Sequence, residues 1–325
     1  MNDIKVKIGC VIPCYKGGKI TIEVIKSALK FVELIVLVDD RCPYKTGKNV
    51  EEIFSDSKKI QVLFNKENLG VGGSTKKGMQ YLMDHDCEII VKVDADGQIN
   101  PDLIPQLINP ILNGESNASK GNRFSSLDNI LSMPPIRVFG NLGLSFINKL
   151  STGYWELFDP TNGFIAIKSN ALKKVRLDKI DNRYFFESDF LFQCGLQNIC
   201  FYQLPMKSIY EKEESSLRPL KEIFRFGKKH TINFFKRIIY QYFLLDFNIG
   251  SLELLSSSIL SLILFIFVIK VYLNGAINNQ FATPGEANLI GLLAIITAQL
   301  IIGFVYYDST QQPLLRRLKA GNKTT

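Results

Sequence analysis

Two carboxylates spaced two residues apart are the groups best able to do chemistry in this sequence. Asp94 and Asp96 come directly after the apolar run 88–93 and just before Gly97. Carboxylates at i and i+2 beyond a β-strand can both direct oxygen ligands at one hard divalent cation. Mg²⁺ or Mn²⁺ held in this way normally takes its other ligands from water and a diphosphate. The pair therefore predicts a divalent metal and a nucleoside diphosphate partner.

Further polar residues follow other short apolar runs. An isolated acidic pair in such a position is more often a turn or a helix cap than a functional site. Two acidic pairs at matching strand ends of one sheet instead point to a shared cleft. Besides Asp94 and Asp96, the residues that we expect around this cleft are Pro13, Tyr15, Asp39, Asp40 and Asn68.

Alternating strands and helices in the first 215 residues must position these side chains. The expected strands are residues 7–12, 34–38, 60–64 and 88–93, and the expected helices are residues 19–31, 50–55, 74–83 and 101–112. Alternation at this spacing predicts an α/β fold with a mostly parallel sheet covered by helices. Such sheets bind ligands beyond the carboxyl ends of their strands.

Two segments near the C-terminus are long and apolar enough to cross a bilayer. Residues 252–273 and 288–307 each provide about 20 residues, which matches a hydrocarbon layer of about 30 Å. Two buried core helices are the alternative, but core helices are rarely this long and this apolar on all sides. The link 274–287 has no lysine or arginine, whereas basic residues flank the pair of segments. By the positive-inside rule both ends are cytoplasmic, and we expect a prokaryotic plasma membrane.

The net charge of +8 is concentrated in the C-terminal third of the chain. Residues 1–215 hold 27 Lys and Arg against 26 Asp and Glu, whereas residues 216–325 hold 12 against 5. This excess lies beside the apolar segments and favours an anionic membrane surface over nucleic acid as the partner. Within it, residues 217–247 interleave basic and aromatic side chains and predict a helix in the headgroup layer. An amphipathic helix packed on the soluble domain is the alternative.

The expected organisation has four parts: a cytosolic domain (1–215), basic amphipathic juxtamembrane helices (216–250), two transmembrane helices (251–307) and a basic cytosolic tail (308–325). The six cysteines lack CxxC spacing and the chain opens with charged residues, which predicts free thiols. The glycine-rich segment 68–73 matches neither GxGxxG nor a P-loop, so dehydrogenase and kinase chemistry lose support. The two histidines, His85 and His230, are expected at the surface or an interface.

Seven short motifs together resemble family 2 glycosyltransferases. The resemblance is to the membrane-tethered branch that includes dolichyl-phosphate mannose synthase-like and polyprenyl-phosphate glycosyltransferases, and it covers about residues 7–215. The motifs are Ile12-Pro13-Cys14-Tyr15, Val38-Asp39-Asp40, Asn68-Leu69-Gly70, Val93-Asp94-Ala95-Asp96-Gly97-Gln98, Lys120-Gly121-Asn122-Arg123-Phe124, Asp159-Pro160-Thr161-Asn162-Gly163-Phe164 and Phe185-Phe186-Glu187-Ser188-Asp189. Each motif is common alone, whereas their joint occurrence is specific.

The resemblance implies a GT-A fold, a Rossmann-like and mostly parallel sheet with flanking helices. It also implies inverting transfer from a nucleoside diphosphate sugar with Mg²⁺ or Mn²⁺. The donor site would comprise Pro13, Tyr15, Asp39, Asp40, Asn68, Asp94 and Asp96, the last two also holding the metal. The acceptor or its phosphate would lie near Arg123 and Gly163, and charge placement adds Arg218 and Arg225. The catalytic candidates are Asp189, Glu187 and Asp96. The family usually has Asn or Asp where this chain has Lys16, so the donor loop departs from the pattern.

The acidic position near the acceptor matters more for a weakly acidic acceptor than for one that is already ionised. An attacking hydroxyl must lose a proton, and a carboxylate within about 3 Å that accepts it contributes about 10²–10⁴ in rate. A phosphate monoester, with a second pKa of about 6, is already largely ionised at neutral pH. We expect a membrane lipid as acceptor. Replacing Asp189 by alanine should then cause moderate loss with a polyprenyl phosphate and near-total loss with a hydroxyl on a lipid-linked glycan.

Two other functions stay open at this point. A processive polysaccharide synthase would need more than two spans and a Gln-x-x-Arg-Trp motif, whereas the one tryptophan, Trp155, lies elsewhere. A non-catalytic membrane-tethered subunit that binds nucleotide sugars would have no need to keep Asp40, Asp94, Asp96 and Asp189 together. Association of two copies through the apolar hairpin is also open.

Overall fold

The computed structural model of the chain describes residues 6–125, 135–207, 219–278 and 280–321. The chain divides into two units. Unit 1 comprises Met1–Phe234 together with Leu315–Thr325, and unit 2 comprises Phe235–Leu314. The chain therefore leaves unit 1 and returns to it, with all of unit 2 in between.

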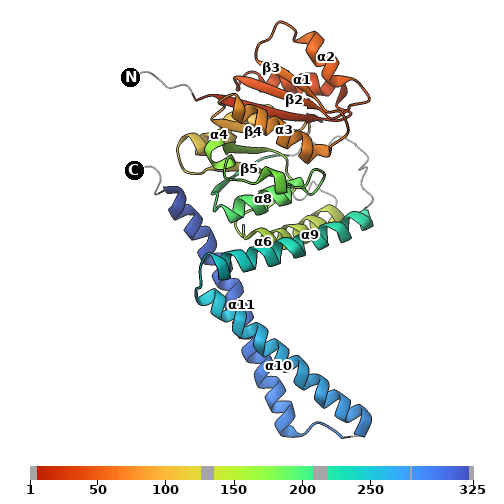
Figure 1. Ribbon diagram of the computed structural model, residues 1–325, viewed down its shortest axis with the longest axis vertical. Coiled ribbons are helices and arrows are strands. Elements are labelled where there is room, and N and C mark those ends of the chain that lie inside the picture. Colours follow the sequence, from red (N-terminus) through yellow and green to blue (C-terminus); the bar gives the residue numbers. More distant parts are fainter. Residues whose placement is uncertain (1–5, 126–134, 208–218, 279, 322–325) are drawn as a thin grey trace. The chain divides into compact units, whose positions relative to one another are not determined.

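Unit 1 is built on a seven-stranded sheet with the order β3-β2-β1-β4-β6-β5-β7 (Figure 1). The strands are β1 (Ile8–Cys14), β2 (Leu34–Asp39), β3 (Ile60–Phe64), β4 (Ile89–Lys92), β5 (Ala118–Asn122), β6 (Ile165–Lys168) and β7 (Phe201–Pro205). Strands β1 to β4 run parallel, as do β5 and β7, whereas β6 is antiparallel to β4 and β5. The predicted mostly parallel α/β sheet is confirmed.

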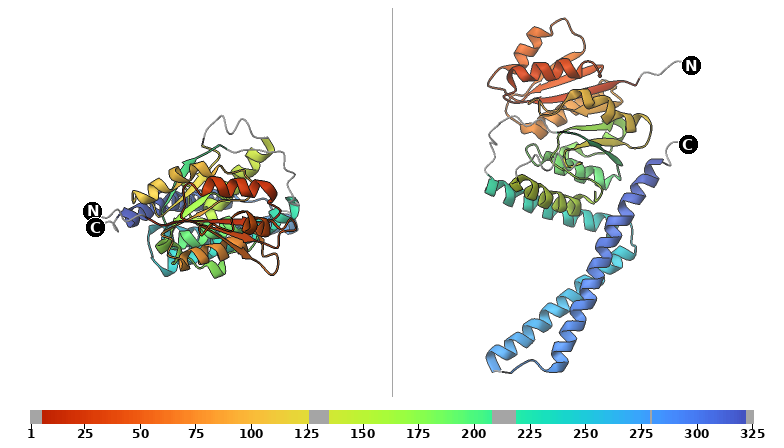
Figure 2. Two further views of the ribbon diagram at one scale, coloured as in Figure 1. Left: turned by 90° about the horizontal axis from the view of Figure 1, so that it is seen from above. Right: turned by 180° about the vertical axis from the view of Figure 1, so that it is seen from behind.

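Helices cover both faces of this sheet (Figure 2). The helices that the structure describes up to the end of α9 are α1 (Gly18–Ala28), α2 (Thr46–Ile53), α3 (Gly70–Asp84), α4 (Ile104–Leu112), α6 (Pro135–Thr152), α7 (Ser169–Leu172), α8 (Phe186–Leu196) and α9 (Pro219–Ile239), with single 3₁₀ turns at Pro101–Leu103 and Leu177–Lys179. Alternate side chains of a strand point to opposite faces. Ile12 of β1 accordingly packs with α1 and α4, and its neighbour Val11 packs with α3 and α8. All six cysteines are free and buried in these layers.

The four parallel strands end at one edge of the sheet. Cys14 at the end of β1 lies opposite Asp39 at the end of β2, and Asp39 lies opposite Phe64 at the end of β3. The pairing continues beyond the strands, because the amide of Asp40 donates to the Cys14 carbonyl and the amide of Asn65 donates to the Asp39 carbonyl, both at 2.9 Å. The residues after these strands are thus brought side by side.

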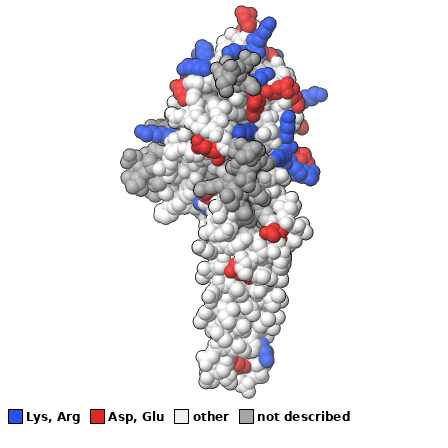
Figure 3. Space-filling view, turned by 90° about the vertical axis from the view of Figure 1, so that its left-hand side faces the viewer, with Lys and Arg blue, Asp and Glu red and all other residues white. Residues whose placement is uncertain are grey.

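Two long apolar helices make up most of unit 2. They are α10 (Ile249–Asn278) and α11 (Pro284–Gly321), whose last residues belong to unit 1. Ile249–Asn278 and Pro284–Gln311 are long and apolar enough to cross a membrane, with mean hydropathies of 2.4 and 2.3. Only 6% and 11% of their most apolar stretches are buried, and few charged side chains appear on them in Figure 3. The alternative of two buried core helices therefore does not fit, and the predicted spans lie inside these helices.

Unit 2 also contains a buried ion pair. Arg237 of α9 donates from both terminal nitrogens to Asp308 of α11, at 2.7 and 2.9 Å, and both side chains are 1% exposed. The hydroxyl of Tyr242 donates to the same carboxylate at 2.7 Å. Burying an arginine and an aspartate is costly unless each is paired and hydrogen-bonded. This cluster therefore fixes the end of α9 to α11 within unit 2.

Candidate functional site

The first strand ends in one buried and one exposed site candidate. Pro13 lies inside β1 opposite Val38 and is buried, so it shapes the strand end. Tyr15 follows the strand and its side chain is 51% exposed. The ammonium group of Lys16 lies 5.6 Å from the centre of the Tyr15 ring. Of these residues, Tyr15 is the one that can cover a flat ligand such as a nucleotide base.

Asp39 organises the loop that leads into α2. Its side chain is 3% exposed, and its two carboxylate oxygens accept from the amides of Cys42 at 2.7 Å and Gly47 at 2.8 Å. Gly47 lies in the first turn of α2. A carboxylate at a helix N-terminus is stabilised by the unpaired amides and by the helix dipole. Asp39 is therefore a structural cap beneath the edge of the site.

Asp40 also accepts hydrogen bonds from backbone amides, those of the glycine-rich 68–73 loop. This name covers Asn68, Leu69 and the first turn of α3. One oxygen accepts from the amide of Leu69 and from Asn65, and the other accepts from the amide of Gly70, all at 2.8 Å. Asn68 in turn donates to the Asp40 carbonyl at 3.3 Å. Since Asp40 is only 2% exposed, its carboxylate is committed to holding this loop. Gly70 has φ +85°, a conformation that favours glycine.

Lys92 lies at the junction of three predicted site residues. Its fully buried ammonium group is 2.6 Å from Oδ1 of Asp94 and 3.4 Å from Oε1 of Glu187, and it donates to the Gly163 carbonyl at 3.3 Å. These partners come from the end of β4, the first turn of α8 and the loop before β6. The structure therefore brings Asp94, Gly163 and Glu187 together around a lysine that sequence reasoning missed.

Charges at this junction depend on one another. Burial raises the pKa of Glu187, although the charge of Lys92 opposes that rise. Burial also disfavours the ammonium form of Lys92, but the carboxylates of Asp94 and Glu187 outweigh it and raise the pKa of Lys92. An isolated charge at such depth would be very costly. The positive charge of Lys92 and the negative charges of its carboxylate partners therefore stabilise one another.

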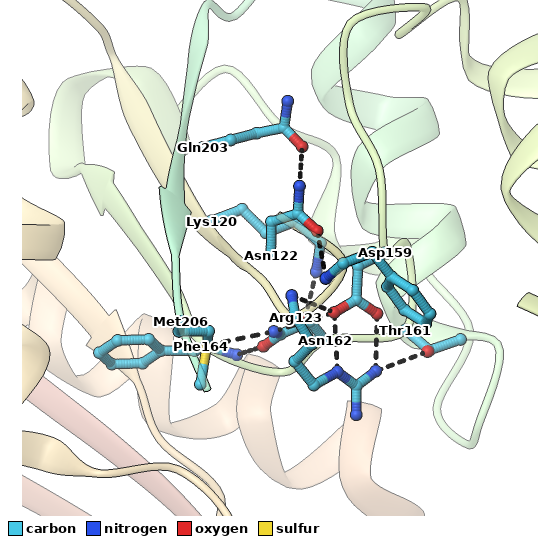
Figure 4. A network of polar contacts seen from close by, with 10 residues as sticks. Lys120, Asn122, Arg123, Asp159, Thr161, Asn162, Phe164, Gln203 and Met206 are labelled. Carbon is cyan, nitrogen blue, oxygen red and sulfur yellow. Dashed lines mark hydrogen bonds and ion pairs between the residues drawn. The ribbon is translucent and has the colours of Figure 1, made fainter. Parts of the chain in front are cut away.

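A second buried ion pair lies beside the first. Arg123, just after β5, donates from Nε and Nη2 to the two oxygens of Asp159 at 2.7 and 2.6 Å (Figure 4). Asp159 is fully buried; burial pushes its pKa up, but the hydrogen bonds and charge of Arg123 bring the pKa below its usual range. This two-point geometry is the strongest form of arginine–carboxylate contact. The ion pair thus fixes Arg123 against the 159–163 loop, which carries Gly163.

Two buried lysines donate hydrogen bonds to backbone carbonyls of the 159–163 loop. Lys120 of β5 donates to the carbonyl of Asn162, and Lys92 of β4 donates to the carbonyl of the next residue, Gly163. Burial lowers the pKa of Lys120 to about 8, with Asp159 opposing the shift. Gly163 has no room for a side chain, because a Cβ there would come closer than 3.0 Å to both Asp94 and Lys92. The 159–163 loop is therefore fixed tightly against the end of β4.

The Asp94–Asp96 pair fits a divalent cation. Both aspartates are partly exposed; Oδ1 of Asp94 accepts from the ammonium group of Lys92 at 2.6 Å, and Oδ1 of Asp96 accepts from the amide of Gln98 at 3.0 Å. The described residues contain no cluster of three or more His, Cys, Asp or Glu side chains that could hold a metal alone. Mg²⁺ commonly uses one or two carboxylates and completes its shell with substrate phosphates and water. The residues present fit that mode of binding.

Asp189 faces away from this junction. One carboxylate oxygen accepts from the amide of Asp181 at 2.9 Å, and the other accepts from Asn233 of α9 at 2.7 Å. Burial raises the pKa of Asp189, with Asn233 opposing the shift. Of the two acidic candidates on α8, Glu187 contacts the Lys92 junction and Asp189 contacts α9.

The two basic candidates that precede the apolar segments are Arg225 and Arg218. Arg225 of α9 is 42% exposed at its side chain and lies 3.8 Å from Asp181, where Lys229 also forms an ion pair. Arg218 lies outside the described residues. The expectation that these arginines receive a lipid phosphate thus stays a prediction.

Sequence reasoning missed Lys92 and assigned no role to Lys120 and Asp159, although both stand in the motifs quoted above. One signal was available, because Lys92 interrupts the apolar run Ile89 to Val93. A lysine is almost never fully buried without a partner, so its presence inside a central strand indicates buried carboxylates nearby. One of them, Asp94, lies two residues along the chain, whereas the other, Glu187, lies on α8, which the sequence patterns did not place.

Comparison with known proteins fixes the family. Residues 10–176, more than half of the chain, match the model of Glycosyl transferase family 2. The chain belongs to this family. A UDP-N-acetylglucosamine–dolichyl-phosphate N-acetylglucosaminyltransferase of Methanococcus voltae is 30% identical to this glycosyltransferase over 213 residues, which cover 62% of this chain and 84% of the relative. An undecaprenyl-phosphate mannosyltransferase of Micrococcus luteus is 24% identical over 49% of this chain and 65% of the relative.

The fold of this family 2 glycosyltransferase is GT-A, as its resemblance implied. It is similar to the crystal structure of glucosyl-3-phosphoglycerate synthase from Mycobacterium tuberculosis, in complex with Mn²⁺, UDP and glucosyl-3-phosphoglycerate. The TM-score is 0.50, with 18% identity over 72% of this chain and 80% of that chain. The prediction of an enzyme of the glycosyltransferase class is confirmed. The alternative of a non-catalytic subunit loses its basis.

Proposed function

We propose that this glycosyltransferase moves one sugar from a nucleoside diphosphate sugar to a polyprenyl phosphate at a membrane surface, with inversion at the anomeric carbon. The acceptor class is supported by the two relatives, whose names specify dolichyl phosphate and undecaprenyl phosphate. The donor class is supported by the UDP in the name of one relative and in the complex of the similar crystal structure.

The observation that carries this proposal is that both acidic candidates for a general base are already engaged. Glu187 is paired with Lys92, and both oxygens of Asp189 accept hydrogen bonds. A hydroxyl acceptor would require one of these carboxylates to take its proton in addition to, or in place of, its present contacts. A phosphate monoester needs no such group, because it is already largely ionised near neutral pH. The arrangement therefore favours a phosphate acceptor over a hydroxyl acceptor.

The reaction is then a single displacement. An ionised oxygen of the lipid phosphate attacks the anomeric carbon of the sugar and forms the new C–O bond. The bond from that carbon to the diphosphate breaks, and its electron pair leaves with the nucleoside diphosphate. Because the attacking oxygen carries no proton, no proton transfer to the protein is needed. Attack opposite the leaving group inverts the configuration at the anomeric carbon.

The residues around the donor have separate tasks in this account. Tyr15 would cover the nucleotide base, and the 68–73 loop, held by Asp40, would approach the donor through its backbone. Asp94 and Asp96 would hold Mg²⁺ or Mn²⁺, which when bound supplies positive charge for the leaving diphosphate. The fixed 159–163 loop would present Gly163 to the sugar, where the absence of a side chain leaves room.

The apolar helices provide the means to meet a lipid acceptor. The chain leaves unit 1 at Phe234 and re-enters it at Leu315, with both candidate spans between these points. An even number of crossings returns the chain to the starting side of the membrane. Together with the basic residues that flank the hairpin, this supports a cytoplasmic catalytic unit on a prokaryotic plasma membrane. The basic side chains of α9 would lie close to the lipid phosphates.

A comparison of two acceptors tests the proposal. The full chain in detergent is incubated with radiolabelled UDP- and GDP-sugars and with either a polyprenyl phosphate or the corresponding polyprenol. We expect organic-extractable label from one donor with the phosphate and none with the alcohol. Equal transfer to the polyprenol, or transfer to a soluble sugar acceptor alone, would contradict the proposed acceptor.

A further inference from the structure

The 181–183 segment lies directly against the glycine-rich 68–73 loop. The carbonyl of Asn182 accepts from the amide of Gly73 at 2.9 Å. The guanidinium of Arg183 reaches Asn68 at 3.5 Å, the outer limit of a hydrogen bond. A Cβ on Gly72 would collide with the carbonyl oxygen of Asp181. The loop that Asp40 fixes from one side is therefore covered by this segment on the other.

The opposite side of the same segment is held by α8 and α9. The Asp181 amide donates to Asp189, whose second oxygen accepts from Asn233, so one carboxylate joins three elements. The carboxylate of Asp181 forms an ion pair with Lys229 of α9. These contacts lie within unit 1 and are mostly shielded from water, where hydrogen bonds to a charged group are strongest.

From these contacts we infer that Asp189 is a positioning residue for the donor loop, acting together with Asn233 through the 181–183 segment, and takes no proton from the acceptor. The inference rests on the proposed function, since it assumes that the 68–73 loop binds the nucleotide donor. It assigns to α9, the helix nearest the apolar spans in sequence, a contribution to donor affinity.

A positioning role and a general-base role predict different changes in the kinetic constants of the variants. Losing a base lowers kcat and leaves the affinity for nucleotide intact. Losing a support of the donor loop raises the donor KM and weakens nucleotide binding, because the loop must then be ordered on binding. Asn233 separates the two roles further, since removing it leaves the Asp189 carboxylate itself in place.

The test measures kcat and the KM for the donor with Asp189→Asn and Asn233→Ala in the full chain, with UDP and GDP binding measured separately by calorimetry. We expect both variants to raise the donor KM and the nucleotide Kd by about tenfold, the effect of losing one buried hydrogen bond. The kcat should stay within about threefold of wild type, and the acceptor KM should not change.

Two glycine variants provide a control that does not touch the carboxylate. Gly72→Ala should raise the donor KM by displacing the 181–183 segment from the loop side, whereas Gly227→Ala, which has open space around it on α9, should leave every parameter unchanged. If Asp189→Asn lowered kcat by about two orders of magnitude or more, with an unchanged donor KM and full activity in Asn233→Ala, the inference would be overturned. Absence of turnover by the wild-type protein with every donor would instead refute the proposed function.

Discussion

Lys92 of β4 forms a buried ion pair with Glu187 of α8, with 3.4 Å between Nζ and Oε1. The same ammonium group lies 2.6 Å from Asp94, so one lysine serves two carboxylates. Without Lys92, Glu187, whose pKa burial raises, would lose the positive charge that opposes this rise. Lys92 thus links Glu187 to the end of β4, where the donor diphosphate is expected.

Replacing Lys92 by methionine should damage both stability and activity. The variant leaves Asp94 and Glu187 without their common counter-ion, and breaking a buried pair in this way costs roughly 3–5 kcal/mol. We expect the thermal unfolding midpoint to fall by about 10 °C and kcat to drop at least tenfold. Lys59→Met, at an exposed lysine, is the matched control and should behave like wild type.

A double variant identifies the electrostatic part of this effect. Lys92→Met combined with Glu187→Gln removes one charge of each sign from the junction. The double variant should unfold at a higher temperature than Lys92→Met alone, because fewer charges remain uncompensated. Strictly additive losses in the two single variants and the double variant would show that the ion pair does not couple these residues.

Glu187→Gln should retain most of its activity with a polyprenyl phosphate. Glutamine keeps a hydrogen-bond acceptor for Lys92, and the ionised acceptor needs no base. We expect kcat to fall by less than about tenfold, whereas loss of a required base would cost about 10²–10⁴. Steady-state kinetics at saturating donor measures this difference, and a loss within that larger range would identify Glu187 as the base.

Gly163→Ala should inactivate the enzyme without unfolding it. A methyl group at this position would come closer than 3.0 Å to Asp94 and Lys92 and would displace the 159–163 loop from the end of β4. We expect kcat to fall by at least tenfold, with the thermal midpoint lowered by the few degrees that strain of about 1–3 kcal/mol causes. Gly140→Ala on α6, which meets no atom within 4 Å, controls for the added methyl group.

Two aspartate variants compare a buried ion pair with an exposed one. Asp159→Ala removes a fully buried carboxylate and leaves Arg123, whose side chain is 24% exposed, without this partner, so it should destabilise the protein by roughly 1–3 kcal/mol. Asp178→Ala removes an ion pair with Arg176 in which both side chains are more than 60% exposed, so the thermal unfolding midpoint should stay close to that of wild type. Thermal unfolding in the same detergent compares them, and equal losses would contradict the importance of the buried pair.

His230 should make the protein acid-sensitive. It is 2% exposed and contacts Ser151 of α6, in keeping with the interface position that was one of the two expected from sequence, and burial lowers its pKa to about 4. The unfolded chain binds this proton at a pKa of about 6.5, so stability falls as the pH drops from about 6.5 to about 4, by at most about 3 kcal/mol. His230→Gln should flatten this part of the pH–stability curve. An unchanged slope in the variant would show that His230 is not buried in its neutral form.

Part of the fold was predictable because each early strand or helix shows its hydrophobic pattern within a short stretch of sequence. Strand β3 matches the expected residues, and the other three early strands differ from expectation by a few residues at their ends. The length and apolar character of the two C-terminal helices were equally evident from sequence. Strands β5, β6 and β7 were missed; the antiparallel insertion of β6 between β4 and β5 is decided by pairing that no local pattern records.

The site was predictable in its motifs but not in its contacts. Asp94 and Gly163 were expected in the same site, and the structure joins them through Lys92. Asp40 and Asp189 were also expected to contact substrates, but both carboxylates are occupied by neighbouring amides. Sequence shows which residues can do chemistry, whereas hydrogen bonds from distant segments decide which of them are free to do it.

The most direct test of the central claim is the chemical structure of the lipid product. The full chain is incubated with the donor that it uses and with a polyprenyl phosphate, and the extracted lipid is examined by mass spectrometry and by NMR of its anomeric carbon. The account predicts a lipid heavier by one sugar residue, with a single phosphate and the anomeric configuration opposite to that of the donor. A diphosphate-linked product, a retained configuration, or release of free sugar without any lipid product would contradict it.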